Sequence, residues 1–406
     1  MERLPATAAA DNSASSRWIE ALSRQDTIIT SIFARAGFEP VATPVIQPAD
    51  LFLDLIGEDL RARTYVFTDP DGAELCLRPD LTIPATRLYL DRFGDSGQPA
   101  RFAYNGLVFR YQRAGDNLAR PREFRQAGIE YFAPEAPAQA EAEILALTAE
   151  SIRAAGLGAF SLRIGDLGIF EALLGAIQMP ARWRASLHHH FWHPAAFRRQ
   201  LQKLTKPEEF GRALEAPLLA AMEAARRGAS GLGDRVAALE RHFEARGLAA
   251  SGTRTLDEIA EQLEGLSADM RSAPLDPRSA LLLDAYIKLT GPARATPDQV
   301  RALLKGTGLD IDPVLARFDA RLRLAAQEGL DISDAPFAGG FGRQFEYYTG
   351  FVFEVLSPML DESTPIAGGG RYDRLVEAIS GGTSIAAVGS AIHADRLLLA
   401  VRGGRP

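Results

Sequence analysis

Hydrophobic side chains recur at helical spacing in the first patterned segment of the chain. Between residues 17 and 37, Trp18, Leu22, Ile29 and Phe33 fall about one helical turn apart, and Gly37 follows. A glycine after the last apolar position is typical of a helix C-terminus, so we expect a helix ending near Gly37. The next run, PVATPVIQP, mixes β-branched residues with proline. Because proline cannot donate to a strand ladder, this run predicts an edge strand.

Shorter apolar runs then alternate with turn residues. Strands are predicted for TYVFTD, AELCLRP, ARFAYNGLVFRYQ and FRQAGIEYFA, each bounded by Gly, Pro or Asp. QAEAEILALTAESIRAAGLG has a 3.6-residue period and predicts a helix, after which residues 159–170 return to a strand pattern. Residues 1–172 therefore read as the first part of an α/β (α+β) domain.

The pattern changes to helical spacing between residues 173 and 330 and then changes back. In residues 331–406, FEYYTGFVFEVLSP predicts a strand, AGGGRYDRLVEAIS a glycine turn with a helix, and SIAAVGSAIHADRLLLAVR a strand with a helix. The sequence thus predicts one mixed domain interrupted by a helical insertion. The length of 406 residues agrees, since it exceeds what one hydrophobic core usually supports.

Composition narrows the function classes. Lys and Arg total 45 against 52 Asp and Glu, and the net charge of −7 disfavours nonspecific nucleic-acid binding. Cys76 is the only cysteine, which excludes an internal disulfide and a cysteine-based zinc site. The N-terminal segment carries Glu2 and Asp11 and lacks the apolar core of a signal peptide. No apolar run reaches membrane-spanning length, so we expect a cytoplasmic protein with no membrane partner.

Two segments carry side chains suited to charged ligands. Residues 101–126 hold six arginines against Asp116 and Glu123, and arginine forks bind carboxylate or phosphate bidentately. The alternative for this segment is a solvated hairpin. In LRPDLT, Asp80 and Thr82 form an acceptor pair for an ammonium group. The alternative for Asp80 is a cap on the following helix.

Other candidate groups are weaker alone. FGRQFEYYTGFVFE and AGGGRYDRL bring Arg343 and three tyrosines, although tyrosines are usually core residues and glycines turn formers. Neither Walker nor dinucleotide-binding spacing is present. In LHHHFWHP, His189 and His193 have no Cys, Asp or Glu beside them, so we predict no metal site.

In combination these motifs resemble a known family. FRYQ, RPREFRQAGIE, EYYTGFVFE, GGGRYDRLVE and GSAIHADRLLL together look like the class II aminoacyl-tRNA synthetase core in its histidyl-tRNA synthetase version. The resemblance covers roughly residues 17–170 and 335–400. It implies an antiparallel sheet of six or seven strands flanked by helices. It also implies a dimer whose interface includes the first helix and the proline strand near Pro44.

The resemblance also implies a histidine pocket. By motif, the α-ammonium group would meet Asp80, Thr82 and Gln126, and the carboxylate would lie near Arg110. Glu130 and Tyr348 would contact the imidazole. The residues expected to close the pocket are Arg343, Tyr347 and Tyr372.

Departures from the synthetase pattern fall on the ATP motifs. Gln112 stands where synthetases carry glutamate, and His393 and Ala394 precede the acid–arginine pair where they carry glycine. Losing a carboxylate and adding an imidazole should impair nucleotide binding, which leaves Arg122 and Arg396 as candidates for residual phosphate binding. Arg396 also lies ten residues before Pro406, so we expect no anticodon-binding domain.

This combination resembles the regulatory subunit of ATP phosphoribosyltransferase. That family implies a noncatalytic protein of histidine biosynthesis that needs no cofactor, binds L-histidine for feedback control and supports a short catalytic subunit. It further implies a homodimer within a hetero-oligomer, without tRNA. The alternatives are a ligase that adenylates histidine or a related amino acid, and a structural scaffold. A preserved polar pocket argues against the scaffold, because buried polar groups without a ligand are costly.

Overall fold

The computed structural model describes residues 12–53, 58–112, 119–206, 236–237, 240–241, 265, 268–269, 271–342 and 347–404. The chain divides into two compact units, Met1–Ala172 with Ile287–Pro406, and Leu173–Tyr286. The insertion predicted from the sequence runs to residue 330, whereas the structure groups residues 287–330 with the first unit. Most of residues 207–270, which the sequence assigned to helices, lie outside the described residues.

Before the second unit, the first unit alternates short strands with helices. Its elements in chain order are α1 (Asn12–Arg35), β1 (Glu39–Pro40), β2 (Ile46–Pro48), α2 (Asp50–Leu53), α3 (Glu58–Arg61), β3 (Tyr65–Thr68), β4 (Glu74–Leu77), α4 (Thr82–Phe93), β5 (Ala100–Phe109), β6 (Glu123–Phe132), α5 (Pro137–Ala154) and β7 (Ser161–Asp166).

The second unit is helical where it is described. Its helices are α6 (Leu167–Ala176), which begins in the first unit, α7 (Ala181–His190), α8 (Pro194–Thr205) and α13 (Pro277–Lys288), which ends in the first unit. The first unit then continues with β8 (Thr290–Pro292), the 3-10 helix η1 (Ala293–Ala295), α14 (Thr296–Leu304), α15 (Asp312–Gln327), β9 (Pro336–Ala338), β10 (Phe351–Leu356), β11 (Ala367–Arg371), α16 (Asp373–Ser380), β12 (Ala387–His393) and α17 (Ala394–Val401).

One large sheet organises the first unit. Its nine strands run in the order β1-β5-β6-β12-β11-β10-β7-β9-β8. The six from β5 to β7 pair antiparallel, so the predicted antiparallel sheet flanked by helices is confirmed. The count exceeds the expected six or seven because three short strands extend the two edges, with parallel pairing of β1 to β5 and of β7 to β9. A separate three-stranded sheet has the order β2-β4-β3.

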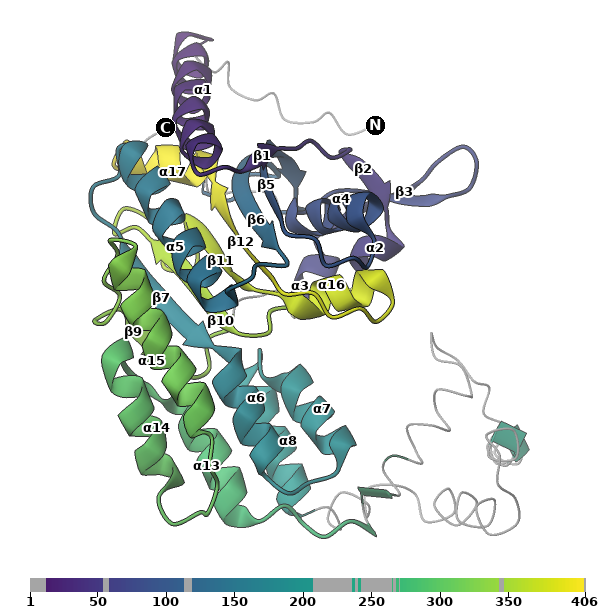
Figure 1. Cartoon of the computed structure of the whole chain (residues 1–406). Coiled ribbons are helices and arrows are strands. Elements are labelled where there is room, and N and C mark those ends of the chain that lie inside the picture. The colour runs from purple at the N-terminus through teal and green to yellow at the C-terminus, as the bar shows by residue number, and fades with distance from the viewer. Residues whose placement is uncertain are drawn as a thin grey trace. The chain divides into compact units, whose positions relative to one another are not determined.

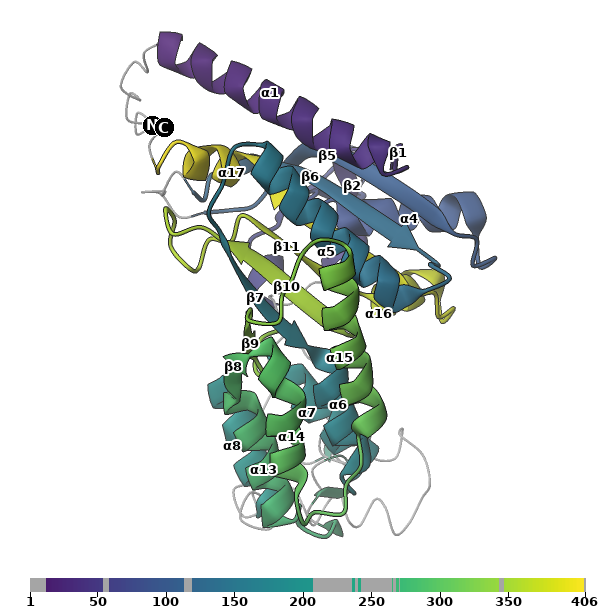
Figure 2. The ribbon, with the colours of Figure 1, turned by 60° about the vertical axis from the view of Figure 1, so that its left-hand side comes forward.

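Helices cover both faces of the large sheet (Figures 1 and 2). α5 packs on one face with α1 beside it, whereas α4 and α16 pack on the other. The apolar positions of α1 explain its place, because Leu22 and Trp18 pack against Ala394 and Leu398 of α17. Among the described helices, none is long and apolar enough to cross a membrane.

The proline run and the strand at residues 159–170 differ from their predictions. PVATPVIQP is divided between β1, at the edge of the large sheet, and β2, at the edge of the small one. The strand after α5 ends at Asp166, where α6 begins. The apolar run continues through this boundary, so its composition cannot separate the strand from the helix.

The glycine turn predicted at AGGGR is wrong, because these residues form the central strand β11. Both of its edges are paired, to β10 and to β12. A Cβ built on Gly369 would lie 2.2 Å from the carbonyl oxygen of Gly389 on β12. Glycine is therefore needed here for the close approach of two backbones, a role that its low strand propensity conceals.

We predict that Gly369→Ala destabilises the first unit by about 2 kcal/mol or more, because the added methyl group must push β11 and β12 apart. Gly158→Ala serves as the control, since a Cβ there meets nothing within 4 Å. Urea unfolding of the two variants checks the difference. Equal stability of Gly369→Ala and the wild type would contradict the close-approach argument.

Candidate functional site

A pocket opens on the α4 face of the large sheet. Its floor lies over facing residues on β6 and β12. Polar and small residues alternate along β6, and β12 contributes one polar and two small residues. The pairs are Gln126 with His393, Gly128 with Ala391, and Glu130 with Gly389. Because alternate residues of a strand share one face, all six belong to the same side of the sheet. The small residues leave the space that the polar side chains enclose.

The pocket brings together eight of the nine residues predicted to bind histidine. These are Asp80, Thr82, Arg110, Gln126, Glu130, Tyr347, Tyr348 and Tyr372. The ninth, Arg343, lies outside the described residues. The pocket has an empty volume of about 350 Å³, open space at its mouth included.

Glu130 is the most deeply buried acid of the pocket, with no exposed surface. Tyr104 donates a hydrogen bond of 2.8 Å to its Oε1, and Tyr372 donates one of 2.5 Å to its Oε2. Burial raises the pKa of the Glu130 carboxyl to about 7, although the hydrogen bonds from Tyr372, Thr82 and Tyr104 lower it. Burial also raises the pKa values of Tyr104 and Tyr372 well above the usual range for tyrosine. Both hydroxyl groups therefore keep their protons and remain hydrogen-bond donors.

Two glycines make room for this cluster. A Cβ on Gly389 would lie 1.5 Å from Oε2 of Glu130, and one on Gly128 would lie 2.5 Å from the hydroxyl oxygen of Tyr104. Tyr104 thus reaches Glu130 by crossing over Gly128. A larger residue at Gly389 would displace the carboxylate, and one at Gly128 would displace Tyr104.

The other end of the pocket carries acceptors for a cation. Asp80 is 2% exposed, and its Oδ1 accepts a hydrogen bond of 3.2 Å from the backbone N–H of Ile83 in α4. Asp80 thus accepts a hydrogen bond from the first turn of α4 and also lines the pocket. Both are compatible because a carboxylate can accept several hydrogen bonds. The side-chain oxygen of Gln126 is buried and has no hydrogen-bond partner among the described residues. A ligand ammonium group would supply the missing donor.

Arg110 and His393 form a second wall. The Arg110 guanidinium lies 5.2 Å from the ring centroid of Phe124, and the His393 ring stacks on the same Phe124 at 4.9 Å. The Nε of Arg110 donates a hydrogen bond of 2.8 Å to the carbonyl of Pro79. These contacts hold the guanidinium of Arg110, which lines the pocket together with Asp80. A guanidinium can bind a carboxylate bidentately.

A smaller second pocket adjoins this wall and shares Arg110 and His393 with the first. It is also lined by Arg63, Gln112, Arg120, Pro121, Phe124, Asp395 and Arg396. Arg396 donates to the carbonyls of Ala119 and Pro365 at 2.7 and 2.8 Å. Arg122 was predicted, like Arg396, as a candidate for phosphate binding. It is not among the residues that line this pocket, and its Nε donates to the carbonyl of Gln112 at 3.1 Å.

The chain is similar in sequence to known proteins over most of its length. The family model for histidyl-tRNA synthetase matches residues 14–280 and 271–397. A regulatory subunit of ATP phosphoribosyltransferase from Allorhizobium ampelinum is 35% identical over 372 residues, which cover 91% of this chain and 95% of that protein. One of the same name from Mesorhizobium japonicum is 34% identical over 371 residues, covering 91% of this chain and 95% of that protein. The chain belongs to the family of ATP phosphoribosyltransferase regulatory subunits.

Solved structures show the fold of this regulatory-subunit family. A Bacillus halodurans structure described as an ATP phosphoribosyltransferase regulatory subunit/histidyl-tRNA synthetase has a TM-score of 0.64 at 20% identity, covering 99% of this chain and 83% of that one. Histidyl-tRNA synthetase from Nostoc has a TM-score of 0.58 at 16% identity, covering 100% of this chain and 77% of that one. The predicted class II synthetase-like fold is therefore confirmed.

Sequence reasoning missed part of this regulatory-subunit pocket. Tyr104 and Gly389 are absent from the predicted set, and His393 was noted only as a departure from the synthetase motif. Strand alternation could have placed Tyr104 on the same face as its register partner Gly128. The contribution of Gly389 depends on a pairing with Glu130 across 259 residues of sequence, since 389 minus 130 is 259. A local pattern cannot show such a pairing.

The histidine cluster is arranged differently from a metal site. α7 ends at His190, and His193 precedes α8 as its N-cap residue, so His189 and His193 are not on one helix. In the described part of the chain, no three His, Cys, Asp or Glu side chains are grouped to hold a metal ion.

We predict that Glu130 makes the stability of the fold depend on pH. Its folded pKa of about 7 exceeds the ordinary glutamate pKa of 4.5, so the folded state holds the proton more tightly. The stability contribution is present below pH 4.5 and is lost as pH rises to about 7, by roughly 3 kcal/mol at 1.36 kcal/mol per unit.

Urea unfolding between pH 5 and 8 tests this dependence. Glu130→Gln should be less sensitive to pH than the wild type, whereas the same substitution at the exposed Glu20 should leave the profile unchanged. Parallel profiles for the wild type and Glu130→Gln would show that Glu130 does not titrate in this range.

Proposed function

We propose that this chain is a noncatalytic regulatory subunit of ATP phosphoribosyltransferase in histidine biosynthesis and that its pocket binds L-histidine. The observation that carries the proposal is the convergence of three kinds of group in one pocket. Asp80 and Gln126 offer acceptors, Arg110 offers a guanidinium, and Glu130 is a buried carboxyl. A free amino acid with a basic ring side chain is complementary to this set.

The spacing on β6 supports the orientation of the ligand. Gln126 and Glu130 are four residues apart on one strand, which is about 13 Å at 3.3 Å per residue. Both residues line the pocket, so a ligand that bridges them would have to lie along β6. The amino group then lies near Gln126, and the imidazole lies near Glu130 and Tyr348.

Selectivity follows from the burial of the polar groups. A ligand without the amino group would leave the Gln126 oxygen unpaired, at a cost of about 1–3 kcal/mol. A ligand without a ring nitrogen would give Glu130 no donor beyond Tyr104 and Tyr372. A ligand without a carboxylate, such as histamine, would leave Arg110 without an ion pair, so we propose that the pocket favours histidine over all three kinds of ligand.

Feedback control requires a partner whose activity depends on the state of the pocket. The family relatives are named as regulatory subunits, and we propose that the partner is a short catalytic subunit whose activity this chain supports. Histidine must then bind two states of the complex unequally. A coupling of about 1–3 kcal/mol would change affinity roughly 5- to 150-fold.

Exposed apolar side chains support a homodimer within that complex. On α1, Ile19 is 64% exposed, and in the three-stranded sheet Ile46, Val66 and Phe67 are also exposed. Ile19 and Ile46 belong to the first helix and the proline run, the segments that the resemblance implies at a dimer interface, and Val66 and Phe67 lie on strand β3 of the same small sheet as Ile46. Burying them against a second copy would remove apolar surface from water.

We predict that calorimetry with the purified chain detects L-histidine binding and that Tyr348→Phe weakens it about 3- to 10-fold by removing one hydrogen bond. Tyr111→Phe, at a ring that is 45% exposed, makes the same chemical change outside the pocket and should bind like the wild type. Histamine should bind far more weakly, since it has no carboxylate for Arg110. Undetectable histidine binding by the wild type would end the proposal.

The joint activity provides the second test. With the short catalytic subunit, histidine should inhibit phosphoribosyl transfer, and Tyr348→Phe should shift the inhibition to higher histidine concentration. If the complex forms but its activity is the same with and without histidine, histidine sensing is refuted. The proposed assembly with the catalytic subunit would still stand.

A second candidate function is a ligase that adenylates histidine. The second pocket favours it, because Arg110 and Arg396 lie there with Arg63 and Arg120. Against it, Arg396 donates to two backbone carbonyls, and Gln112 replaces the expected acid. Histidine-dependent exchange between ATP and pyrophosphate with magnesium tests this function, and its absence would exclude the ligase.

A further inference from the structure

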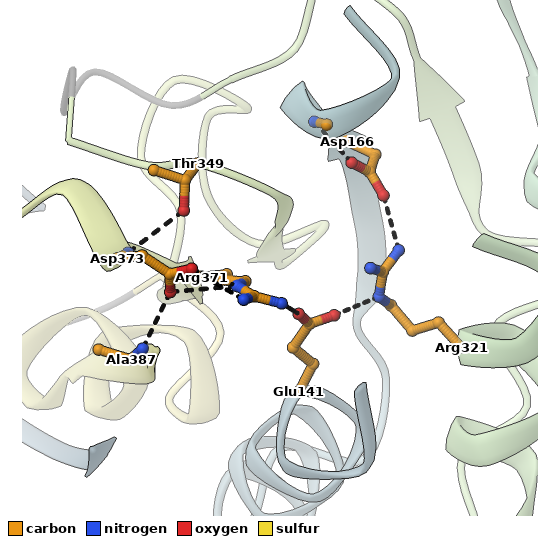
Figure 3. A network of polar contacts seen from close by, with 8 residues as sticks. Glu141, Asp166, Arg321, Thr349, Arg371, Asp373 and Ala387 are labelled. Carbon is orange, nitrogen blue, oxygen red and sulfur yellow. Dashed lines mark hydrogen bonds and ion pairs between the residues drawn. The ribbon is translucent and has the colours of Figure 1, made fainter. Parts of the chain in front are cut away.

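Five charged side chains form a continuous chain that reaches the residues on either side of Tyr372 (Figure 3). Arg321 binds Glu141 and also Asp166, the latter at 2.6 Å. Arg371 approaches the other oxygen of Glu141 at 3.5 Å and binds Asp373 at 2.8 Å. Glu141, Asp166 and Arg321 are 1%, 6% and 7% exposed, so this part of the network is shielded from water.

One end of the network holds the segments that carry two pocket tyrosines. Arg371 and Asp373 flank Tyr372, whose hydroxyl binds Glu130. The backbone N–H of Asp373 donates to the hydroxyl of Thr349 at 3.2 Å, and the N–H of Thr349 donates to the carbonyl of Arg371 at 2.9 Å. Thr349 directly follows Tyr348. Asp373 also accepts a hydrogen bond of 2.9 Å from the N–H of Ala387 at the start of β12.

The other end holds two elements away from the pocket. Arg321 belongs to α15, and Asp166 is the last residue of β7. Oδ1 of Asp166 accepts the N–H of Gly168 at 2.8 Å, in the first turn of α6. The N–H of Leu167 donates to the carbonyl of Gly350 at 3.0 Å. The start of α6 is therefore tied to the Tyr348 segment both directly and through the ion pairs.

Burial makes this network behave as a unit. It contains three acids and two bases, and Glu141 lies between the two arginines. Removing one partner of a buried pair leaves an uncompensated charge, which costs far more than a surface ion pair contributes. If the side chain of Arg371 or Arg321 moves, the side chain of Glu141 has to move with it.

We propose that Arg371 and Asp373 are positioning residues of the pocket and that Glu141 and Arg321 extend their control to α15 and the start of α6. The inference rests on the proposed function in one respect, because the ligand named for the pocket is histidine. Its consequence is reciprocal: a ligand that orders Tyr348 and Tyr372 stabilises α15, and a change at α15 alters ligand affinity.

The alternative is a set of independent stabilising contacts. In that case a substitution would loosen only its own neighbourhood. A network instead transmits a substitution at one end to the other, so two variants at opposite ends distinguish the two descriptions.

Thr349→Val removes the hydroxyl that accepts the Asp373 N–H and keeps the side-chain shape, whereas Thr349→Ser keeps the hydroxyl. Arg321→Lys keeps the charge but loses the forked N–H groups that bridge Glu141 and Asp166. Arg323→Lys makes the same change at an exposed position of the same helix and is the matched control.

Hydrogen exchange of the full chain without histidine is the first measurement. The Arg321 guanidinium lies 4.9 Å from the Phe351 ring centroid, so the readout for Arg321→Lys is residues 373–380 of α16, at the other end of the network. Arg321→Lys should speed exchange of these residues at least about 5-fold, and Thr349→Val should do the same for residues 312–327. Thr349→Ser and Arg323→Lys should match the wild type. Changes confined to the neighbourhood of each substitution would overturn the proposal.

Calorimetry with L-histidine is the second measurement. Arg321 does not line the pocket. The Arg321→Lys variant should nevertheless bind histidine at least about 5-fold more weakly than the Arg323→Lys variant. Equal affinities would also overturn the proposal. If the wild type binds no histidine, the proposed function fails, and the exchange experiment still decides whether the network couples the two ends.

Discussion

The complete burial of the Glu130 carboxyl is the constraint on which the site depends. A carboxyl group inside a sheet face needs donors, and Tyr104 and Tyr372 supply one for each oxygen. It also needs space, which exists because Gly389 has no side chain. Each of these residues comes from a different strand or strand end, so the position of one acid fixes the pairing of β5, β6 and β12 around it. Polar burial thereby specifies the fold as well as the site.

The two adjoining pockets use arginine in different ways. In the first, Arg110 is held against Phe124 and Pro79 and faces a space with acceptors at its other end. In the second, Arg396 hydrogen-bonds to the carbonyls of Ala119 and Pro365, and Arg120 bonds to Ser363. Guanidinium groups that join backbone segments contribute to structure, and a phosphate would have to compete with those bonds. These bonds agree with the proposed function, in which an amino acid is recognised and not activated.

Much of this architecture could be predicted from the sequence because its signals are local. The helical period of α5, the alternating strands β5 and β6, and the motif residues of the pocket are each visible within short segments. The glycines of β11 are the opposite case, since Gly369 signals a turn unless its contact with β12 is known. The charge network was equally hidden, because Glu141 and Arg321 are 180 residues apart and each alone resembles a surface residue of an amphipathic helix. Long-range pairing decides these features, and periodicity does not report it.

The strand order also bears on how the chain folds as it is synthesised. The hairpin of β5 and β6 and the strand β7 belong to the first part of the chain, but β12, β11 and β10 lie between them in the sheet. Until residues 351–393 have been made, β6 and β7 each present an open edge to their surroundings. Exposed strand edges are templates for wrong pairing with other chains. The early segments therefore have to be protected from aggregation while the helical second unit is being translated, and the sheet closes only when its three central strands arrive last.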